Sequence, residues 1–330
     1  MKAAIIGAGV MGRTHAASCH ALPGVEVAAV ADLRPEAARA LAAQYGATAC
    51  AAADEVFADD SIELVIVATS TESHKDIVVR ALDTGKHVFC EKPIARRLDE
   101  GLAMLEAARR APGKAMVGHV LRFFPEYAGI KRLLDAGTIG TPAVARTERN
   151  LYAPPASDNW FLDFDRSGGV IYDLAIHDID FCMACFGPVE RVYAKGLMRP
   201  GASYDHGDYA LITLRFTQGT IAHIEASWLY AAGFYMAFEA AGSTGIVEYD
   251  SRQTRPLVFC PSGAEAKKRI GAELPENPYA ESAYTTELKL FVEAIEQGGE
   301  PPITFDYAVN VLRVADAAER SALSGEAVTL

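Results

Sequence analysis

The chain has 330 residues, half of them hydrophobic, so it has room for two domains with sizeable cores. Its 31 basic and 43 acidic residues are interspersed and give a formal charge of −12, which argues against nucleic acid as a partner. The sequence has no uncharged apolar run of about 18 residues. We therefore expect no membrane contact and, because no signal peptide or disulfide-framework spacing is evident, a cytoplasmic location.

Short apolar runs alternate with amphipathic stretches over the first 120 residues. This alternation is typical of a parallel sheet joined by crossover helices, so it predicts a doubly wound α/β domain at residues 1–120. One helix should begin at Arg34-Pro35, and Gly46 and Gly85 should end two others. The expected strands are residues 2–6, 25–31, 64–68, 87–90 and 115–118.

The pattern changes after an expected linking helix at residues 125–136. Gln218-Gly219 separates two β-rich runs with no helix between them, which indicates a hairpin and a largely antiparallel sheet. We therefore expect an α+β domain at residues 121–330. Its expected strands are residues 143–150, 189–197, 209–216, 220–228 and 234–241, and its expected helices are 170–186, 283–297 and 307–321.

A glycine loop, Gly7-Ala8-Gly9-Val10-Met11-Gly12, follows the first strand and opens a helix. The first glycine allows the tight turn, the second lets the backbone approach a pyrophosphate, and the third lets the helix pack closely on the strand. The helix N-terminus adds amide donors and a positive dipole end. Three such glycines alone are a weak signal, but this context predicts a dinucleotide site.

Asp32 lies 20 residues after Gly12, at the end of the second expected strand. A carboxylate at this place accepts hydrogen bonds from the adenosine ribose hydroxyls and repels a 2′-phosphate. Asp32 therefore favours NAD over NADP, although Arg34 offsets part of that repulsion.

Glu91-Lys92-Pro93 directly follows the strand at 87–90, at the edge of the sheet where open α/β folds bind ligands. The ammonium of Lys92 can hydrogen-bond a substrate oxygen and stabilise negative charge that develops on it. Pro93 raises the question of a cis peptide, which the sequence does not answer. An isolated Glu-Lys pair is more often a solvated surface pair.

Asp173 and His177 lie four residues apart in an expected helix that begins after Gly168-Gly169. A helix places residues of this spacing on one face. An imidazole can take a proton from an alcohol, and a neighbouring carboxylate can fix its tautomer or share the substrate hydroxyl. Alone, such a pair is more often an ordinary helix-surface contact.

Taken together, these motifs resemble the glucose-fructose oxidoreductase and inositol dehydrogenase (Gfo/Idh/MocA) family over essentially the whole chain. The resemblance implies a Rossmann domain followed by an α+β domain with an open, mainly antiparallel sheet that binds substrate and often forms the subunit interface, hence a homodimer or homotetramer. It also implies that Lys92, Asp173 and His177 are catalytic, with His177 as acid/base and Lys92 polarising the reacting oxygen. The shared motifs are the glycine loop, Ala68-Thr69 with His74, Glu91-Lys92-Pro93, and Gly168-Gly169 with Asp173 and His177.

Two positions depart from the family pattern. Ser70 stands where many members have proline, and Ala175 stands where glycine is common. Neither touches the expected chemistry. The expected cofactor contacts are Gly7, Gly9, Val10, Met11, Gly12, Asp32, Leu33, Arg34, Thr69, Ser70, His74, Glu91 and Lys92.

Some weaker candidates fit a structural role better. Arg122 follows the last Rossmann strand, and three aromatic residues offer rings that can stack on a sugar. Cys182 and Cys185 have a CxxC spacing, but no second pair stands at zinc spacing and their neighbours are apolar, so we expect core cysteines and no metal. The substrate-binding candidates are Arg122, Tyr152, Trp160 and Tyr235.

The expected function is an NAD-dependent dehydrogenase that oxidises a secondary hydroxyl of a cyclic polyol or sugar to a ketone. Three alternatives stay open: an NADP(H)-dependent keto-sugar reductase, an NAD-dependent glycoside-cleaving enzyme of the same family, and a regulatory protein that only senses nucleotide. The last has no need to keep Lys92, Asp173 and His177 together.

Overall fold

The computed structural model describes residues 1–152, 160–197, 208–253, 257–261, 270–271 and 281–330. The chain divides into two compact units. The first contains Met1–Val120 and Glu281–Leu312, and the second contains Leu121–Ala280 and Arg313–Leu330. The expected division also falls after Val120, but it assigns residues 281–312 to the other domain.

Residues 281–312 join the first unit through long-range packing. Helix α9 (Ala283–Glu296) packs against helix α1 (Val10–Ala21). Between the two helices, the Thr285 hydroxyl donates a hydrogen bond to the Ser18 hydroxyl at 3.1 Å. An amphipathic pattern shows that a helix must bury one face but does not show which partner covers it, so the sequence could not place this segment.

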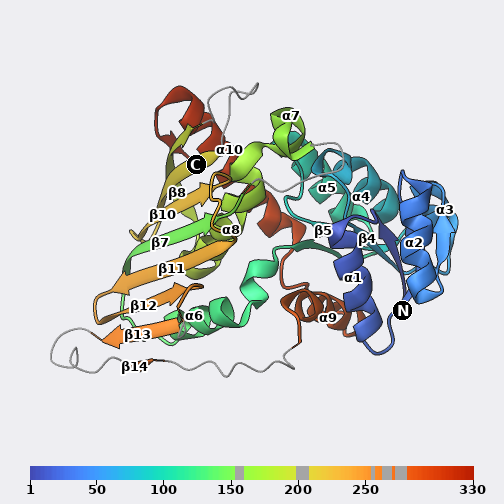
Figure 1. Ribbon diagram of the computed structural model, residues 1–330, viewed down its shortest axis with the longest axis horizontal. Coiled ribbons are helices and arrows are strands. Elements are labelled where there is room, and N and C mark those ends of the chain that lie inside the picture. Colours follow the sequence, from blue (N-terminus) through green and yellow to red (C-terminus); the bar gives the residue numbers. More distant parts are fainter. Residues whose placement is uncertain (153–159, 198–207, 254–256, 262–269, 272–280) are drawn as a thin grey trace. The chain divides into compact units, whose positions relative to one another are not determined.

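The first unit is built on a six-stranded parallel sheet in the order β3-β2-β1-β4-β5-β6 (Figure 1). This order confirms the doubly wound Rossmann architecture. The edge strand β3 was not expected, because a three-residue strand with two exposed residues has no apolar run to reveal it. The strands are β1 (Lys2–Ile6), β2 (Glu26–Ala31), β3 (Thr48–Cys50), β4 (Leu64–Val67), β5 (His87–Glu91) and β6 (Ala115–Gly118).

Local signals start and stop the helices of the first unit. Pro35 occupies the first turn of α2, and Gly46 ends that helix in the left-handed region at φ 67°. Gly85 follows α4 with φ 80°. The other helices are α2 (Pro35–Tyr45), α3 (Ala53–Ala58), α4 (His74–Asp83), α5 (Leu98–Arg110) and the first part of α10 (Phe305–Ser324).

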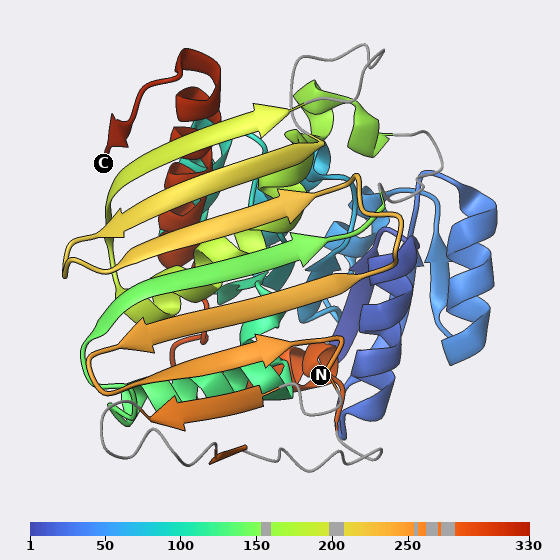
Figure 2. The ribbon, with the colours of Figure 1, turned by 60° about the vertical axis from the view of Figure 1, so that its left-hand side comes forward.

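The second unit is built on a nine-stranded sheet in the order β14-β13-β12-β11-β7-β10-β9-β8-β15, seen side by side in Figure 2. All its strand pairs are antiparallel except β10 with β7, which confirms a mainly antiparallel sheet. The strands are β7 (Pro142–Asn150), β8 (Val189–Leu197), β9 (Tyr209–Phe216), β10 (Ile221–Ser227), β11 (Tyr235–Gly242), β12 (Gly245–Asp250), β13 (Leu257–Pro261), β14 (Ile270–Gly271) and β15 (Val328–Thr329).

Buried and exposed side chains alternate along the central strands, so one face of this sheet is covered and the other is open. Ile212 and Leu214 of β9 and Ile224 of β10 are fully buried, whereas Leu211 and Ile221 on the other face are partly exposed. Helices α6 (Pro125–Asp135) and α8 (Ile176–Phe186) contact strands of the sheet and lie behind it in Figure 2. None of the helices in the described residues is long and apolar enough to cross a bilayer.

One helix of the second unit differs from expectation. Residues 170–186 form a π-helical segment, Ile171–Ala175, followed by the α-helix α8. The Ile176 amide donates to the Ile171 carbonyl, five residues back, so one extra residue is accommodated in this turn. Periodicity alone does not reveal a single wide turn inside a helix. The remaining helix is the short α7 (Phe164–Ser167).

Candidate active site

The register of the parallel sheet aligns the carboxyl ends of four strands. Ile6 of β1 is paired with Ala31 and Val67, and Val67 is paired with Cys90. The next residue on each strand therefore lies along the same edge, where open α/β sheets bind ligands. These four residues are Gly7, Asp32, Ala68 and Glu91.

The glycine loop has the geometry that a pyrophosphate needs. Gly7 has φ +100°, and a Cβ there would meet the Ala68 carbonyl oxygen at 2.4 Å; a Cβ on Gly12 would meet the Gly7 oxygen at 1.7 Å. A Cβ on Gly9 would meet nothing within 4 Å, so this glycine borders open space. The first α-helical hydrogen bond of α1 runs from the Arg13 amide to Gly9, which leaves the preceding amides of the helix N-terminus to bind an anion.

Asp32 is held firmly beside this loop. One carboxylate oxygen accepts the Ala8 amide at 2.7 Å, and the other accepts the Arg34 amide at 2.8 Å. Burial by itself would raise the pKa of Asp32, but these amides and the Arg34 guanidinium hold the pKa below its ordinary value. The ionised carboxylate therefore anchors the glycine loop and keeps lone pairs for further hydrogen bonds.

The exposed residues among the expected cofactor contacts lie next to the glycine loop and Asp32. Val10 is 70% and Leu33 98% exposed, so both offer apolar surface at the edge of the sheet. Thr69 and Ser70 follow β4 and are partly exposed; the Thr69 hydroxyl accepts a hydrogen bond from Ser73 at 2.7 Å. Their arrangement fits NAD: the glycine loop would hold its phosphates, and Asp32 would hold the hydroxyls of the adenosine ribose.

His74 is buried at the start of α4 and does not lie at the surface of this edge. Its Nδ1 is 3.0 Å from the Pro93 carbonyl oxygen and its Nε2 is 3.3 Å from the Thr69 carbonyl oxygen. Burial lowers the pKa of His74, so the imidazole is neutral and has one N–H to donate. We expect that proton on Nδ1, at the shorter contact. His74 therefore supports the loops after β4 and β5.

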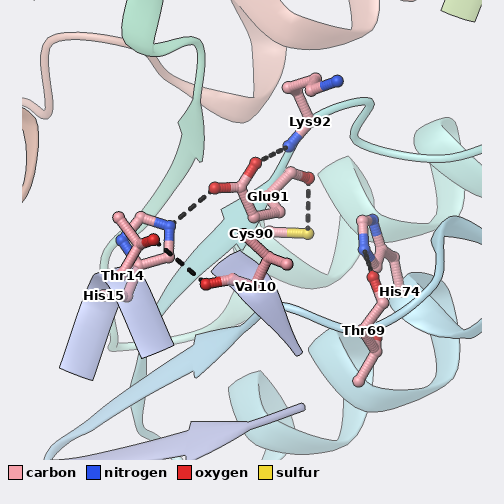
Figure 3. Close-up of polar contacts among 8 residues, drawn as sticks. All are labelled: Val10, Thr14, His15, Thr69, His74, Cys90, Glu91 and Lys92. Atoms are coloured by element: carbon pink, nitrogen blue, oxygen red, sulfur yellow. Dashed lines mark hydrogen bonds and ion pairs between the residues drawn. The ribbon is translucent and has the colours of Figure 1, made fainter. Parts of the chain in front are cut away.

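Glu91 is also buried, and it faces into the first unit (Figure 3). Its Oε1 lies 2.6 Å from His15 Nε2, and its Oε2 accepts the Lys92 amide at 3.1 Å. Burial alone would raise the pKa of Glu91, but the His15 hydrogen bond and the nearby positive charges hold the pKa below its ordinary value. Lys92 itself is partly exposed, and the Lys92–Pro93 peptide is cis.

In the second unit, Asp173 and His177 share an exposed stripe. Of the residues from Ser167 to Met183, these two alone are partly exposed and all the others are buried. Asp173 belongs to the π-helical segment and His177 to the first turn of α8. The carboxylate and the imidazole are thus the two side chains of this stretch that retain partial exposure.

Trp228 is a site residue that the sequence did not reveal. Its fully buried indole donates a hydrogen bond from Nε1 to Asp173 Oδ2 at 3.2 Å. The two residues are 55 positions apart, so no local pattern joins them. The hydrogen bond fixes one oxygen of the candidate catalytic carboxylate.

The buried acids next to His177 form ion pairs. Asp178 is fully buried and pairs with Arg149 of β7 at 2.6 Å. Burial raises the pKa of Asp178, although Arg149 opposes this shift. Asp180 pairs with Arg122 through both carboxylate oxygens, at 2.8 and 2.5 Å. Because Arg122 is engaged in this ion pair, its placement favours a role in holding α8 over direct contact with a substrate.

The aromatic candidates for substrate binding differ in exposure. Tyr152 is 60% exposed, Trp160 is partly exposed and stacks on Phe161, and Tyr235 is 5% exposed beneath the Arg252 guanidinium. Tyr152 therefore has the most surface to offer a ligand. Cys182 is buried and Cys185 is partly exposed; both are free thiols, and burial raises their pKa values.

The hydrogen bond from Trp228 has a measurable consequence. Trp228→Phe removes the N–H and keeps an aromatic ring, so we expect kcat to fall about 10- to 100-fold, because a hydrogen bond to a charged group contributes about 1.5–3 kcal/mol. Steady-state kinetics measures this fall. Tyr45→Phe, which removes the hydroxyl of a ring at the end of α2, is the control; an equal effect of both substitutions would contradict the assignment.

Two family models match parts of the chain that lie in the two units. Residues 1–119 match a family model described as an oxidoreductase family with an NAD-binding Rossmann fold, and residues 127–248 match the GFO/IDH/MocA C-terminal domain. An inositol 2-dehydrogenase of Rhizobium meliloti (strain 1021) is 31% identical over 96% of this chain and 95% of its own length. A scyllo-inositol 2-dehydrogenase (NAD(+)) of Bacillus subtilis (strain 168) is 30% identical over 100% of this chain and 96% of its own length.

The fold is also found in solved structures. A levoglucosan dehydrogenase in complex with NADH and L-sorbose superposes with a TM-score of 0.91 at 24% identity, covering 100% of this chain and 98% of its own. The matched family model and the inositol dehydrogenase relatives identify the chain as an NAD-dependent oxidoreductase. The chain belongs to the GFO/IDH/MocA family.

Proposed function

We propose that this oxidoreductase acts on CH–OH groups and oxidises one secondary hydroxyl of a cyclic polyol or sugar to a ketone. The observation that carries the proposal is the pair of partly exposed residues, Asp173 and His177, on an otherwise buried helix. The inositol dehydrogenases among the relatives support a cyclic polyol as the substrate class.

In this proposal, three residues carry the chemistry. The imidazole of His177 accepts the hydroxyl proton of the substrate, and the Asp173 carboxylate, oriented by Trp228, hydrogen-bonds the same hydroxyl or the imidazole. The Lys92 ammonium hydrogen-bonds the reacting oxygen and stabilises its negative charge. NAD, when bound through the glycine loop and Asp32, supplies the acceptor for the hydride that leaves the substrate carbon.

We further propose a preference for NAD over NADP, carried by Asp32. Asp32→Asn keeps the shape and an acceptor for the Ala8 amide but removes the negative charge. We expect the ratio of kcat/KM for NAD to that for NADP to fall at least tenfold, because a 2′-phosphate is no longer repelled; tenfold corresponds to about 1.4 kcal/mol. Steady-state kinetics with both cofactors measures the ratio. The neighbouring Glu36→Gln is the control, and an NADP preference of the unmodified protein would refute this role.

The direct test of the function is a screen for NADH release across inositols, aldoses, sugar acids and amino sugars. The proposal expects NADH and a ketone in equal amounts from at least one cyclic polyol or sugar. Oxidation of NADPH by keto-sugars with no NAD activity would indicate the reductase instead. Release of free aglycone from a glycoside without net NADH would indicate the glycoside-cleaving alternative.

We also infer a cytoplasmic homodimer or homotetramer that associates through the second unit's sheet. The open face of the sheet carries exposed apolar side chains, among them Tyr193 at 40% and Leu211 at 42%. Five cysteines are free thiols, as in a reducing compartment: Cys19, Cys50, Cys90, Cys182 and Cys185. Sedimentation equilibrium gives the subunit number.

A further inference from the structure

The segment Glu91-Lys92-Pro93 is contacted by two buried histidines from two different helices. Figure 3 shows His15 of α1 and His74 of α4 on opposite sides of Glu91. His15 is 0% and His74 1% exposed, so neither can touch a ligand without a rearrangement of the first unit. Their contacts therefore act on the segment itself.

The first contact runs through the Glu91 carboxylate. His15 Nε2 lies 2.6 Å from Oε1, while Oε2 accepts the backbone amide of Lys92 at 3.1 Å. A carboxylate that is buried must be paired, and here both of its oxygens have a partner. Because each partner fixes one oxygen, the orientation of the carboxylate and the position of the Lys92 main chain are set by His15.

The second contact reaches the segment from its other end. The Nδ1 of His74 is 3.0 Å from the carbonyl oxygen of Pro93, the residue after Lys92. The Lys92 main chain is thus held through its own amide on one side and through the next residue's carbonyl on the other.

His15 also connects this segment to the glycine loop. It lies three residues after Gly12 on α1, the helix whose N-terminus opens at Gly9. The imidazole packs edge-on against Phe89 of β5 at a centroid distance of 4.9 Å, which fixes the ring as well as its hydrogen bond. The helix at the cofactor loop and the lysine at the end of β5 are therefore joined by one rigid side chain.

We propose that His15 and His74 are positioning residues that fix Lys92 relative to the bound cofactor, His15 through the Glu91 carboxylate and His74 through the Pro93 carbonyl. This inference rests on the catalytic role proposed for Lys92. Holding the main chain on both sides of Lys92 limits where its ammonium reaches, and a displacement of about 1 Å at a reacting centre can cost about 10²-fold in rate.

Hydrogen exchange tests the contact without any turnover. In the NADH complex, His15→Leu is expected to speed exchange of the Lys92 amide at least tenfold, because Glu91 loses the partner that orients it. His15→Gln, which can donate one N–H to Glu91, should recover part of the protection. His20→Leu, an exposed position on the same helix, is the control. Unchanged exchange in His15→Leu would overturn the proposal.

A second variant controls for the possibility that His15→Leu misfolds. His15→Leu combined with Glu91→Leu removes both polar partners and leaves no unpaired buried charge, which limits the loss of stability. The Lys92 amide loses its acceptor in this variant as well, so its exchange should also be fast. Protection equal to that of the unmodified protein would show that the carboxylate does not hold the amide, and would overturn the proposal.

Kinetics then tests the link to Lys92. His15→Leu and His74→Leu are each expected to lower kcat at least tenfold while the Kd for NADH, measured by nicotinamide fluorescence, changes less than threefold. When Lys92→Met is already present, adding His15→Leu should lower kcat less than threefold further, because the ammonium that His15 positions is gone. A full tenfold further loss in that background would refute positioning through Lys92.

A failure of the proposed function would give a different set of results from a failure of the positioning proposal. If Lys92→Met leaves kcat within a few-fold of the unmodified protein, Lys92 is not catalytic, whatever the exchange of its amide. If Lys92→Met is nearly inactive and His15→Leu is fully active, Lys92 is catalytic and the positioning proposal is wrong. The two results are therefore distinguishable.

Discussion

Lys92→Ala is expected to lower kcat by about 10²- to 10⁴-fold, the usual contribution of a positioned charged or acid/base group in a proton-transfer step. The ammonium is partly exposed at the end of β5, and its main chain is held through Glu91, so the substitution removes the charge and leaves the supporting contacts in place. Steady-state kinetics on the substrate found by the screen measures the loss.

The specificity of this effect is checked in two ways. Lys75→Ala removes an exposed lysine of the same unit and should leave kcat unchanged, and the Kd for NADH should change little in Lys92→Ala if the main loss is in the chemical step. Added ethylamine should restore part of the rate by supplying an ammonium in the space that the side chain vacates. Turnover within a few-fold of the unmodified protein would contradict the role of Lys92.

His177→Ala is expected to cost a similar factor, about 10²- to 10⁴-fold in kcat, because the substrate hydroxyl loses the base that takes its proton. The pH profile should change as well: the limb that reports the protonation of the base should disappear. Imidazole in the buffer should restore activity in proportion to its concentration. Rate measurements across pH, with and without imidazole, check all three results.

The matched control for His177 lies in the same unit. His223 on β10 is also partly exposed, and its Nδ1 is 3.1 Å from the Thr213 hydroxyl, so His223→Ala removes a comparable side chain that no step uses. Its kcat should match the unmodified protein. If His223→Ala and His177→Ala lowered kcat equally, the loss would reflect damage to the second unit, and His177 would not be the base.

The sequence was most informative where a function depends on neighbouring residues. The glycine loop, the strand before it and Asp32 at the end of the next strand lie within the first 32 residues, and the register of β1 and β2 brings Gly7 and Asp32 to one edge as expected. Likewise, the strand before Glu91 predicted that Lys92 follows β5 at the same edge.

The sequence was less informative where a side chain's role depends on a distant partner. Glu91 and His74 were expected to contact the cofactor, and both side chains instead are buried and bind His15 and the Pro93 carbonyl. The contacts of these two side chains are with the protein itself, and no local pattern shows that. Only tertiary structure brings residues 76 positions apart, such as His15 and Glu91, into one hydrogen bond.

What the sequence alone determined was therefore five of the six strands of the first unit and their alternation with helices, the mainly antiparallel sheet of the second unit, and the dinucleotide loop, because each follows from local periodicity and turn residues. Only the tertiary structure decided that residues 281–312 join the first unit, that Asp173 lies in a π turn beside Trp228, and that buried histidines hold the chain around Lys92. These features arise from contacts across long stretches of chain, which no local pattern encodes.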